Sequence, residues 1–247
     1  MDDKRWRVRL AIGLVAASAV LYSVHFLIFR DTRHIFIYLL GDIAFLPLQV
    51  LLVTMILNEL LERRSKEELM EKLDMVIDAF FAETGTDLLG KFASFDTSLD
   101  AVRNKLVPTP EWKAGDFARA QAAVRAHHFD IDITAGDLEG LKRFLAAQRP
   151  FLLQLLQNQN LLEHETFTDT LWAVFHVADE LTHRRSLEGL PASDLAHLAG
   201  DIGRAYAALA AQWIGHLDHL RMHYPYLYSL AVRTNPLDPQ ARVEVTA

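Results

Sequence analysis

The chain has 247 residues, of which 51% are hydrophobic and 23% are charged, and its mean hydropathy of +0.10 is high for a soluble protein. The absence of cysteine excludes disulfides, thiolate metal sites and cysteine nucleophiles. Residues 58–247 carry 19 basic and 28 acidic side chains, and this acidic balance argues against nucleic acid as a partner. The apolar residues are instead concentrated in the first 57 positions.

Two apolar runs near the N-terminus predict a transmembrane helical hairpin. Residues 10–29 contain no Asp, Glu, Lys or Arg, and residues 35–57 contain a single acid, Asp42. At about 1.5 Å per residue, either run can cross the roughly 30 Å hydrocarbon core of a bilayer as a helix. A cleaved signal peptide is the rival interpretation of the first run. The second run follows after only five residues, however, which leaves little room for cleavage.

Basic residues on both sides of the hairpin predict its orientation. Four of the first nine residues are Lys or Arg, and Arg63, Arg64 and Lys66 follow the second run, whereas the loop at 30–34 has two. Because Lys and Arg are retained on the cytoplasmic side, both termini are expected inside. The sequence therefore predicts a multi-pass protein of the inner (plasma) membrane, in contact with lipid, with residues 58–247 in the cytoplasm.

An unbroken helix is predicted to continue from the second span into a stalk over residues 58–85. Its apolar residues Leu69, Leu73, Val76 and Phe80 recur at spacings of four, three and four, which places them on one face. Two interpretations of this stripe remain open. It packs either within the chain, as a helical hairpin with the next helix, or between subunits, as a coiled coil of a homo-oligomer.

The remaining sequence predicts an all-α cytoplasmic domain at residues 86–235 and a disordered tail at 236–247. Gly85 is expected to end the stalk and Thr86 to cap the next helix. Apolar faces, caps and Pro or Gly breaks predict further helices at 86–106, 110–127, 138–149, 161–185 and 193–223, with a short helix after Pro225. No alternating strand pattern and no internal repeat occurs in the sequence.

Asp42 is the strongest candidate for a functional residue within the spans, because ionisable side chains there usually face protein or water. It lies about 10 Å below the outer end of its span and His25 about 6 Å below the end of the other, so the two can meet. Gln49 lies seven residues beyond Asp42, on nearly the same face. Either Asp42 and His25 form a structural pair that locks the hairpin, or Asp42 and Gln49 line a homo-oligomeric pore or ligand cavity.

Acidic and histidine side chains at helical spacing predict a candidate site for a divalent metal ion in the cytoplasmic domain. The candidate ligands are His176, Asp179, Glu180 and His183 on the helix at 161–185, and His216, His219 and His223 on the helix at 193–223. His197 and Asp201 form a further pair one turn apart. A solvated face of acid–histidine pairs and a pH-responsive histidine cluster are the alternatives.

Three segments, LLEHETFTDTLWAVFHVADEL, DLAHLAGDIGRAY and YPYLYSLAVRTNP, lie downstream of the two spans and the stalk. With those spans and the stalk, they resemble an uncharacterised family of bacterial two-span membrane proteins with a cytoplasmic helical domain. The resemblance covers nearly the whole chain and implies the same architecture. It transfers no activity and no functional residue.

The sequence contains no phosphate-binding glycine loop, nucleophile elbow or HExxH motif, so no catalytic residue is predicted and no cofactor beyond the candidate metal. We expect a non-enzymatic, self-associating membrane protein whose cytoplasmic domain serves as a scaffold or sensor, with room for a cytoplasmic protein partner. A pore lined near Asp42 and Gln49 is the first alternative. A membrane-tethered metal-binding protein is the second.

Overall fold

The computed structural model describes residues 2–109, 111–158, 161 and 164–245, and within these ranges it contains helices and no strand. The expected all-α class is confirmed. The one β pairing among the described residues is an isolated bridge between Asp96 and Ile131. The chain divides after Lys66 into two compact units, and each is described by itself.

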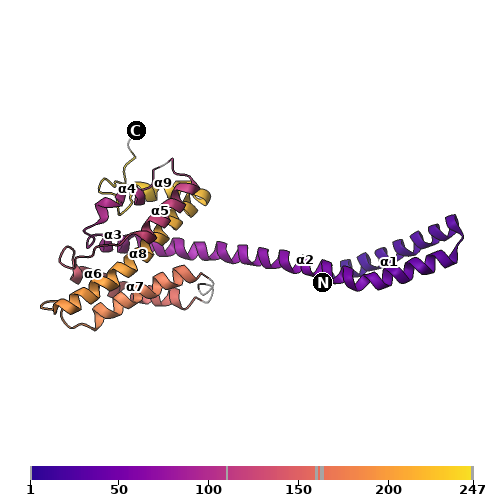
Figure 1. Ribbon diagram of the computed structural model, residues 1–247, viewed down its shortest axis with the longest axis horizontal. Helices are drawn as coiled ribbons and strands as arrows, with labels where there is room; N and C mark the ends of the chain where they lie inside the picture. Colours follow the sequence, from indigo (N-terminus) through magenta and orange to yellow (C-terminus); the bar gives the residue numbers. More distant parts are fainter. Residues whose placement is uncertain (1, 110, 159–160, 162–163, 246–247) are drawn as a thin grey trace. The chain divides into compact units, whose positions relative to one another are not determined.

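The first unit consists of α1 (Asp2–Phe29) and the first part of α2 (Thr32–Phe80), joined by a two-residue turn (Figure 1). In this turn Arg30 lies in the left-handed region, with a φ of 46°, and Asp31 Oδ1 accepts a hydrogen bond of 3.0 Å from the Arg33 backbone N–H. This bond satisfies a donor at the start of α2.

Both helices of the first unit expose apolar side chains on nearly all sides. Val8–Phe29 and part of the apolar segment that starts at Ile35 are long and apolar enough to cross a membrane. These segments include the two spans expected at 10–29 and 35–57. A helix that is apolar all round has no polar face to turn toward water.

The second unit starts at Glu67, within α2 and ahead of the domain start expected at residue 86. After α2 the chain stays helical through the π-helical turn η1 (Phe81–Gly85) into α3 (Thr86–Ala93). Gly85 keeps a helical φ of −63° and does not end the helix as expected. A Cβ at Gly85 would lie 2.6 Å from a ring carbon of Phe80 and 2.7 Å from one of Phe81, so close ring packing requires glycine here.

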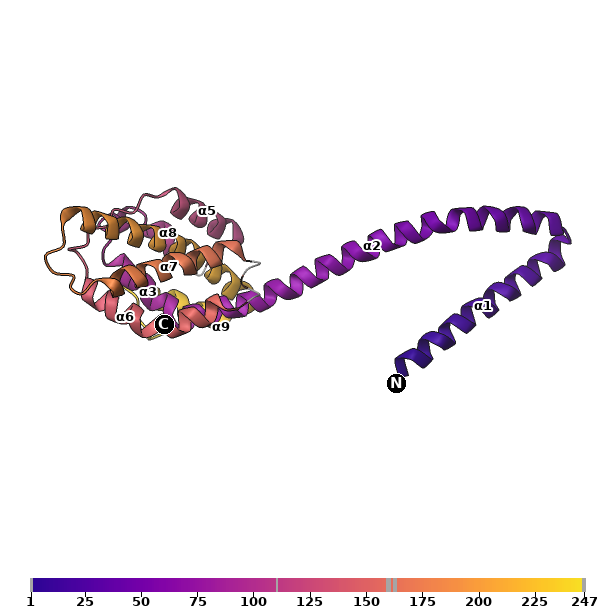
Figure 2. The same ribbon diagram turned by 90° about the horizontal axis from the view of Figure 1, so that it is seen from below.

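The remaining helices of the second unit follow in chain order. They are η2 (Leu99–Ala101), α4 (Arg103–Leu106), α5 (Ala114–Ala126), α6 (Leu138–Leu156), α7 (Glu165–His183), α8 (Ala192–His223) and α9 (Pro225–Arg233). α3, α5, α7 and α9 pack against α8, and α6 packs along α7 (Figures 1 and 2). α8 ends at His223, as expected, and begins one residue before the expected start.

Four expected helices differ from the structure. The helix expected at 86–106 is broken after Ala93 into α3, η2 and α4. α6 passes through Pro150, where a new segment was expected, because Leu145 and Leu152 on either side of it are fully buried and hold the helix together. The helix start expected at Pro110 lies outside the described residues. For the helix expected from residue 161, residues 162 and 163 also lie outside them. α5 begins at Ala114 and α7 at Glu165.

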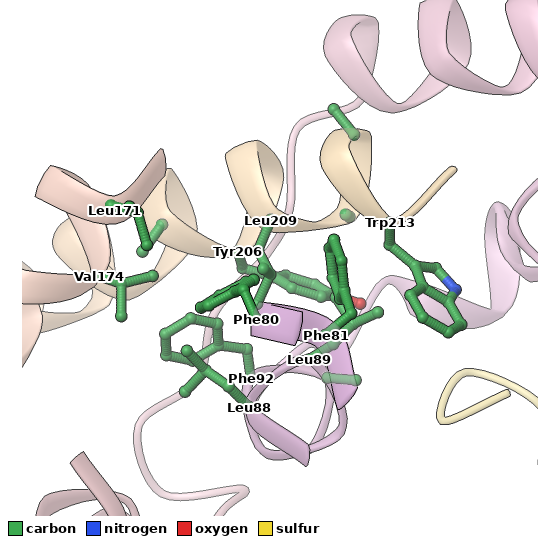
Figure 3. Packing of buried hydrophobic residues seen from close by; sticks show 14 of the residues in the cluster. Phe80, Phe81, Leu88, Leu89, Phe92, Leu171, Val174, Tyr206, Leu209 and Trp213 are labelled. Atoms are coloured by element: carbon green, nitrogen blue, oxygen red, sulfur yellow. The ribbon is translucent and has the colours of Figure 1, made fainter. Parts of the chain in front are cut away.

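One hydrophobic core fills the second unit, and the end of α2 lies inside it (Figure 3). The rings of Phe80 and Phe167 have centroids 5.3 Å apart, and so have those of Phe81 and Trp213. Leu73 is fully buried in the same cluster. The apolar stripe of the expected stalk therefore packs within the chain, and its C-terminal part belongs to the helical domain.

The chain beyond α9 is also part of the domain. Asn235 and Leu237 are buried, and the Leu237 backbone N–H donates to Asn235 Oδ1 at 3.0 Å. The Leu237 carbonyl accepts a hydrogen bond of 3.1 Å from Arg103 Nε. A disordered tail was expected from residue 236, but Leu237 packs against the domain.

Candidate functional site

Two histidine–carboxylate pairs meet where α7 packs on α8. His176 and Glu180 lie one turn apart on α7, and His197 and Asp201 lie one turn apart on α8. The apolar faces of the two helices are buried against each other and place both pairs at the edge of the helix–helix contact. One donor atom from each of the four side chains lies within 4.8 Å of the other three. We call these four residues the α7–α8 cluster.

A single buried oxygen lies at the centre of this cluster. Asp201 Oδ2 is 3.1 Å from His176 Nε2 and 3.3 Å from His197 Nε2. Glu180 completes the group, with Oε1 at 3.9 Å from His176 Nε2 and Oε2 at 3.8 Å from His197 Nε2. The Asp201 side chain is 1% exposed, whereas the two imidazoles are 45% and 53% exposed. The cluster therefore has a buried carboxylate floor and an imidazole rim open to solvent.

Two arginines hold the carboxylates of the cluster from outside. Arg204 Nη2 lies 3.0 Å from Asp201 Oδ1, the oxygen that faces away from the imidazoles. Arg184 Nη1 lies 2.7 Å from Glu180 Oε2, and Arg184 also binds both carboxylate oxygens of Asp194, at 2.6 and 3.0 Å. The hydrogen bond from Arg184 holds the pKa of Glu180 below its ordinary value, so Glu180 is ionised at neutral pH.

The other α7 candidates lie outside the cluster. Asp179 forms an ion pair with Arg149, whose guanidinium also covers the Phe175 ring at 4.6 Å. His183 Nδ1 donates to the backbone carbonyl of Asp179 at 2.8 Å, and its side chain is exposed. The four candidates on α7 are close in sequence, but among them only His176 and Glu180 join the cluster with α8.

A second group, the α2–α8 cluster, is formed by Asp74 and Asp78 of α2 with His216 and His219 of α8. His216 Nδ1 lies 2.9 Å from Asp78 Oδ1, and His219 Nδ1 lies 3.3 Å from Asp74 Oδ2. Burial raises the pKa of Asp74, His219 opposes this effect, and the charge of Asp78 adds to it. The four residues line a cavity of about 270 Å³.

His223, the third candidate on α8, does not join the α2–α8 cluster. Its ring stacks on His219 with centroids 4.4 Å apart, and its Nδ1 lies 3.1 Å from the His219 carbonyl. Sequence reasoning missed Asp74 and Asp78 as partners. They precede His216 by more than 130 residues and lie on the segment expected to be a stalk.

The polar candidates of the first unit are placed differently from one another. His25 and Asp42 line the same cavity of about 540 Å³ between α1 and α2, together with Tyr22 and Tyr38. Gln49 is exposed and is not among the residues lining this cavity. The hairpin thus brings Asp42 and His25 to one site and leaves Gln49 apart.

Comparison with known proteins identifies the family. One family model, "MJ1433, N-terminal helical domain", matches residues 2–61, and another, "Uncharacterized protein MJ1433, C-terminal helical domain", matches residues 69–233. The chain is 43% identical over 238 residues to the uncharacterized protein MJ1433 of Methanocaldococcus jannaschii, with 96% of each chain covered. No solved structure shows a significant match. The chain belongs to the MJ1433 family of helical proteins, and because this relative is archaeal, the comparisons do not support the expected bacterial restriction.

Proposed function

We propose that this member of the MJ1433 family is a non-enzymatic integral membrane protein. In this proposal α1 and the first part of α2 form a two-span anchor in the inner (plasma) membrane. The second unit is a cytoplasmic domain that acts by binding, as a scaffold or sensor. One observation carries the proposal: the first unit exposes apolar side chains on nearly all sides, whereas the second unit buries its own in a closed core.

The extent of this exposure supports a lipid environment for the first unit. Leu14, Val15 and Leu27 of α1 are more than 60% exposed, and so is Leu40 of α2. Water-soluble proteins rarely expose contiguous apolar patches of more than a few hundred Å². A bilayer covers such a surface without cost, and the helices satisfy their own backbone hydrogen bonds there.

The distribution of charge supports the orientation with both termini in the cytoplasm. The turn between α1 and α2 carries fewer basic residues than the flanks of the hairpin. By the positive-inside rule, the more basic flanks stay on the cytoplasmic side of the membrane. The binding role rests on the polar groups of the second unit. Its histidines and carboxylates gather in the α7–α8 and α2–α8 clusters, which suit ions or small polar ligands.

Self-association through the exposed faces of the anchor belongs to the same proposal. Asp42 and His25 line one cavity, which supports a structural pair within one hairpin, and Gln49 is exposed outside that cavity. Subunit counting in mild detergent tests the association. A monomer under all detergent conditions would remove self-association and with it the homo-oligomeric pore.

Membrane insertion is tested by fractionation and by thiol labelling, for which a chain without cysteine is well suited. The full chain should stay in the membrane fraction after an alkaline carbonate wash and be released by detergent, whereas a fragment of residues 67–245 should be soluble. In intact spheroplasts a membrane-impermeant maleimide should label Thr32→Cys, the first residue of α2 after the turn, and not Glu188→Cys, in an exposed loop of the second unit. Release by carbonate would refute the anchor. Labelling of Glu188→Cys alone would refute the orientation.

A further inference from the structure

We propose that the α7–α8 cluster is a binding site for one divalent transition-metal ion such as Zn²⁺, with His176, Glu180, His197 and Asp201 as its ligands. This inference does not depend on the membrane anchor, because all four residues belong to the second unit. It goes beyond the spacing on α7, since half of the ligands come from α8.

The distances between the donor atoms fit a tetrahedral site. Zinc binds nitrogen and carboxylate oxygen at about 2.0–2.2 Å, and a tetrahedron of such bonds has edges of roughly 3.3–3.6 Å. Asp201 Oδ2 lies 3.1 and 3.3 Å from the two imidazole nitrogens, which is close to these edges. Glu180 lies slightly farther away, with Oε1 at 3.9 Å from His176 Nε2 and Oε2 at 3.8 Å from His197 Nε2. All four donors lie within 4.8 Å of one another, so side-chain shifts of up to about an ångström in the half-exposed imidazoles and Glu180 bring them to one ion.

The donor types and charges fit a borderline divalent cation. Two neutral imidazoles and two carboxylates offer two nitrogens and two oxygens, and the carboxylates neutralise the charge of the ion. The outer contacts leave these donors available. Arg204 holds Asp201 by Oδ1, and Arg184 holds Glu180 by Oε2, so Asp201 Oδ2 and Glu180 Oε1 face the ion. Such outer hydrogen bonds orient the ligands of known metal sites.

The α2–α8 cluster contains the same residue types in a different arrangement. There His216 Nδ1 lies near Asp78 Oδ1, while His219 directs Nδ1 to Asp74 and lies 3.6 Å from Asp78 Oδ2 by Nε2, so no single oxygen is shared at short distance. In the α7–α8 cluster both imidazoles direct Nε2 to one oxygen, and Arg204 holds the buried carboxylate that carries it through the other oxygen. Two imidazole nitrogens that converge on one point are the arrangement expected of metal ligands.

The test uses the full chain, purified in detergent without a histidine tag and stripped with a chelator. Titration with Zn²⁺ should saturate at one ion per chain, and Co²⁺ should give the visible absorption of a tetrahedral complex. His176→Ala and His197→Ala should each weaken Zn²⁺ binding at least about tenfold and abolish the Co²⁺ spectrum. His183→Ala is the matched control, because it removes an exposed histidine from the same helix and should leave both unchanged.

Circular dichroism of the metal-free variants shows whether each variant is folded, so that loss of metal binding can be told apart from unfolding. If His176→Ala lost helicity, His197→Asn would replace it, because that side chain is more exposed and reaches the cluster from the other helix. Wild-type protein that binds no Zn²⁺ stoichiometrically would overturn the proposal. Equal loss of affinity in His183→Ala and His176→Ala would also overturn it, since binding would then be a property of surface histidines in general.

Discussion

Removal of the end of α2 is expected to unfold the helical domain, although the removed residues precede the segment that the sequence indicates as its start. A fragment of residues 86–245 lacks four core side chains, those of Leu73, Ile77, Phe80 and Phe81, which are 0%, 6%, 0% and 1% exposed. Burial of one such side chain contributes about 1.5–3 kcal/mol, so the four together contribute roughly 6–12 kcal/mol. This equals the whole free energy of unfolding of a typical domain, about 5–15 kcal/mol.

Thermal melting followed by circular dichroism measures this effect on two fragments. Residues 67–245 should give a helical spectrum and one cooperative transition, and residues 86–245 should aggregate or melt without cooperativity. Phe80→Ala in the longer fragment is an intermediate case, with an expected loss of about 3–5 kcal/mol from the cavity that it leaves. A shorter fragment that melts cooperatively at the same temperature would refute the reasoning, because the end of α2 would then be dispensable for the core.

Two further predictions concern single side chains of the helical domain, measured by denaturant unfolding of the soluble fragment. Gly85→Ala should lower the free energy of unfolding by about 1–3 kcal/mol, because the new Cβ meets two phenylalanine rings. Gly200→Ala, where nothing lies within 4 Å, should raise it by about 0.5–1 kcal/mol, and equal effects of the two changes would contradict the packing argument. Burial raises the pKa of Tyr206, whose hydroxyl has no hydrogen-bond partner among the described residues. Its contribution to stability is therefore complete below the unfolded pKa of about 10 and is lost as pH rises above it. Tyr206→Phe should abolish part of the alkaline loss at little cost at pH 7, and an unchanged alkaline slope would count against this account.

Composition and local periodicity are sufficient to predict several features of this chain. The two apolar helices follow from runs that contain at most one charged residue, and the all-α class follows from spacings of three and four without alternation. The end of α8 at His223 was predicted because Pro225 follows it. The pairing of His176 with Glu180 on one face of α7 was also available from the sequence, since residues four apart on a helix are neighbours.

Other features depend on contacts between segments that are distant in the sequence, and they are visible only in the folded structure. The helix expected at 86–106 has suitable periodicity, yet the chain turns after α3, where the Thr97 backbone N–H donates to the Asp130 carbonyl at 2.9 Å. Gly85 stays helical because two rings enclose it, and nothing in its own sequence neighbourhood distinguishes this from a helix end.

The same reason governs the candidate sites. His176 and Glu180 gain His197 and Asp201 as partners only because the apolar faces of α7 and α8 pack in one particular rotation. His216 meets Asp78 for a similar reason, across more than 130 residues of chain. Helical periodicity states which side chains share a face. Which two faces meet is set by the complementary shapes of the buried side chains, and those shapes act only in the folded core.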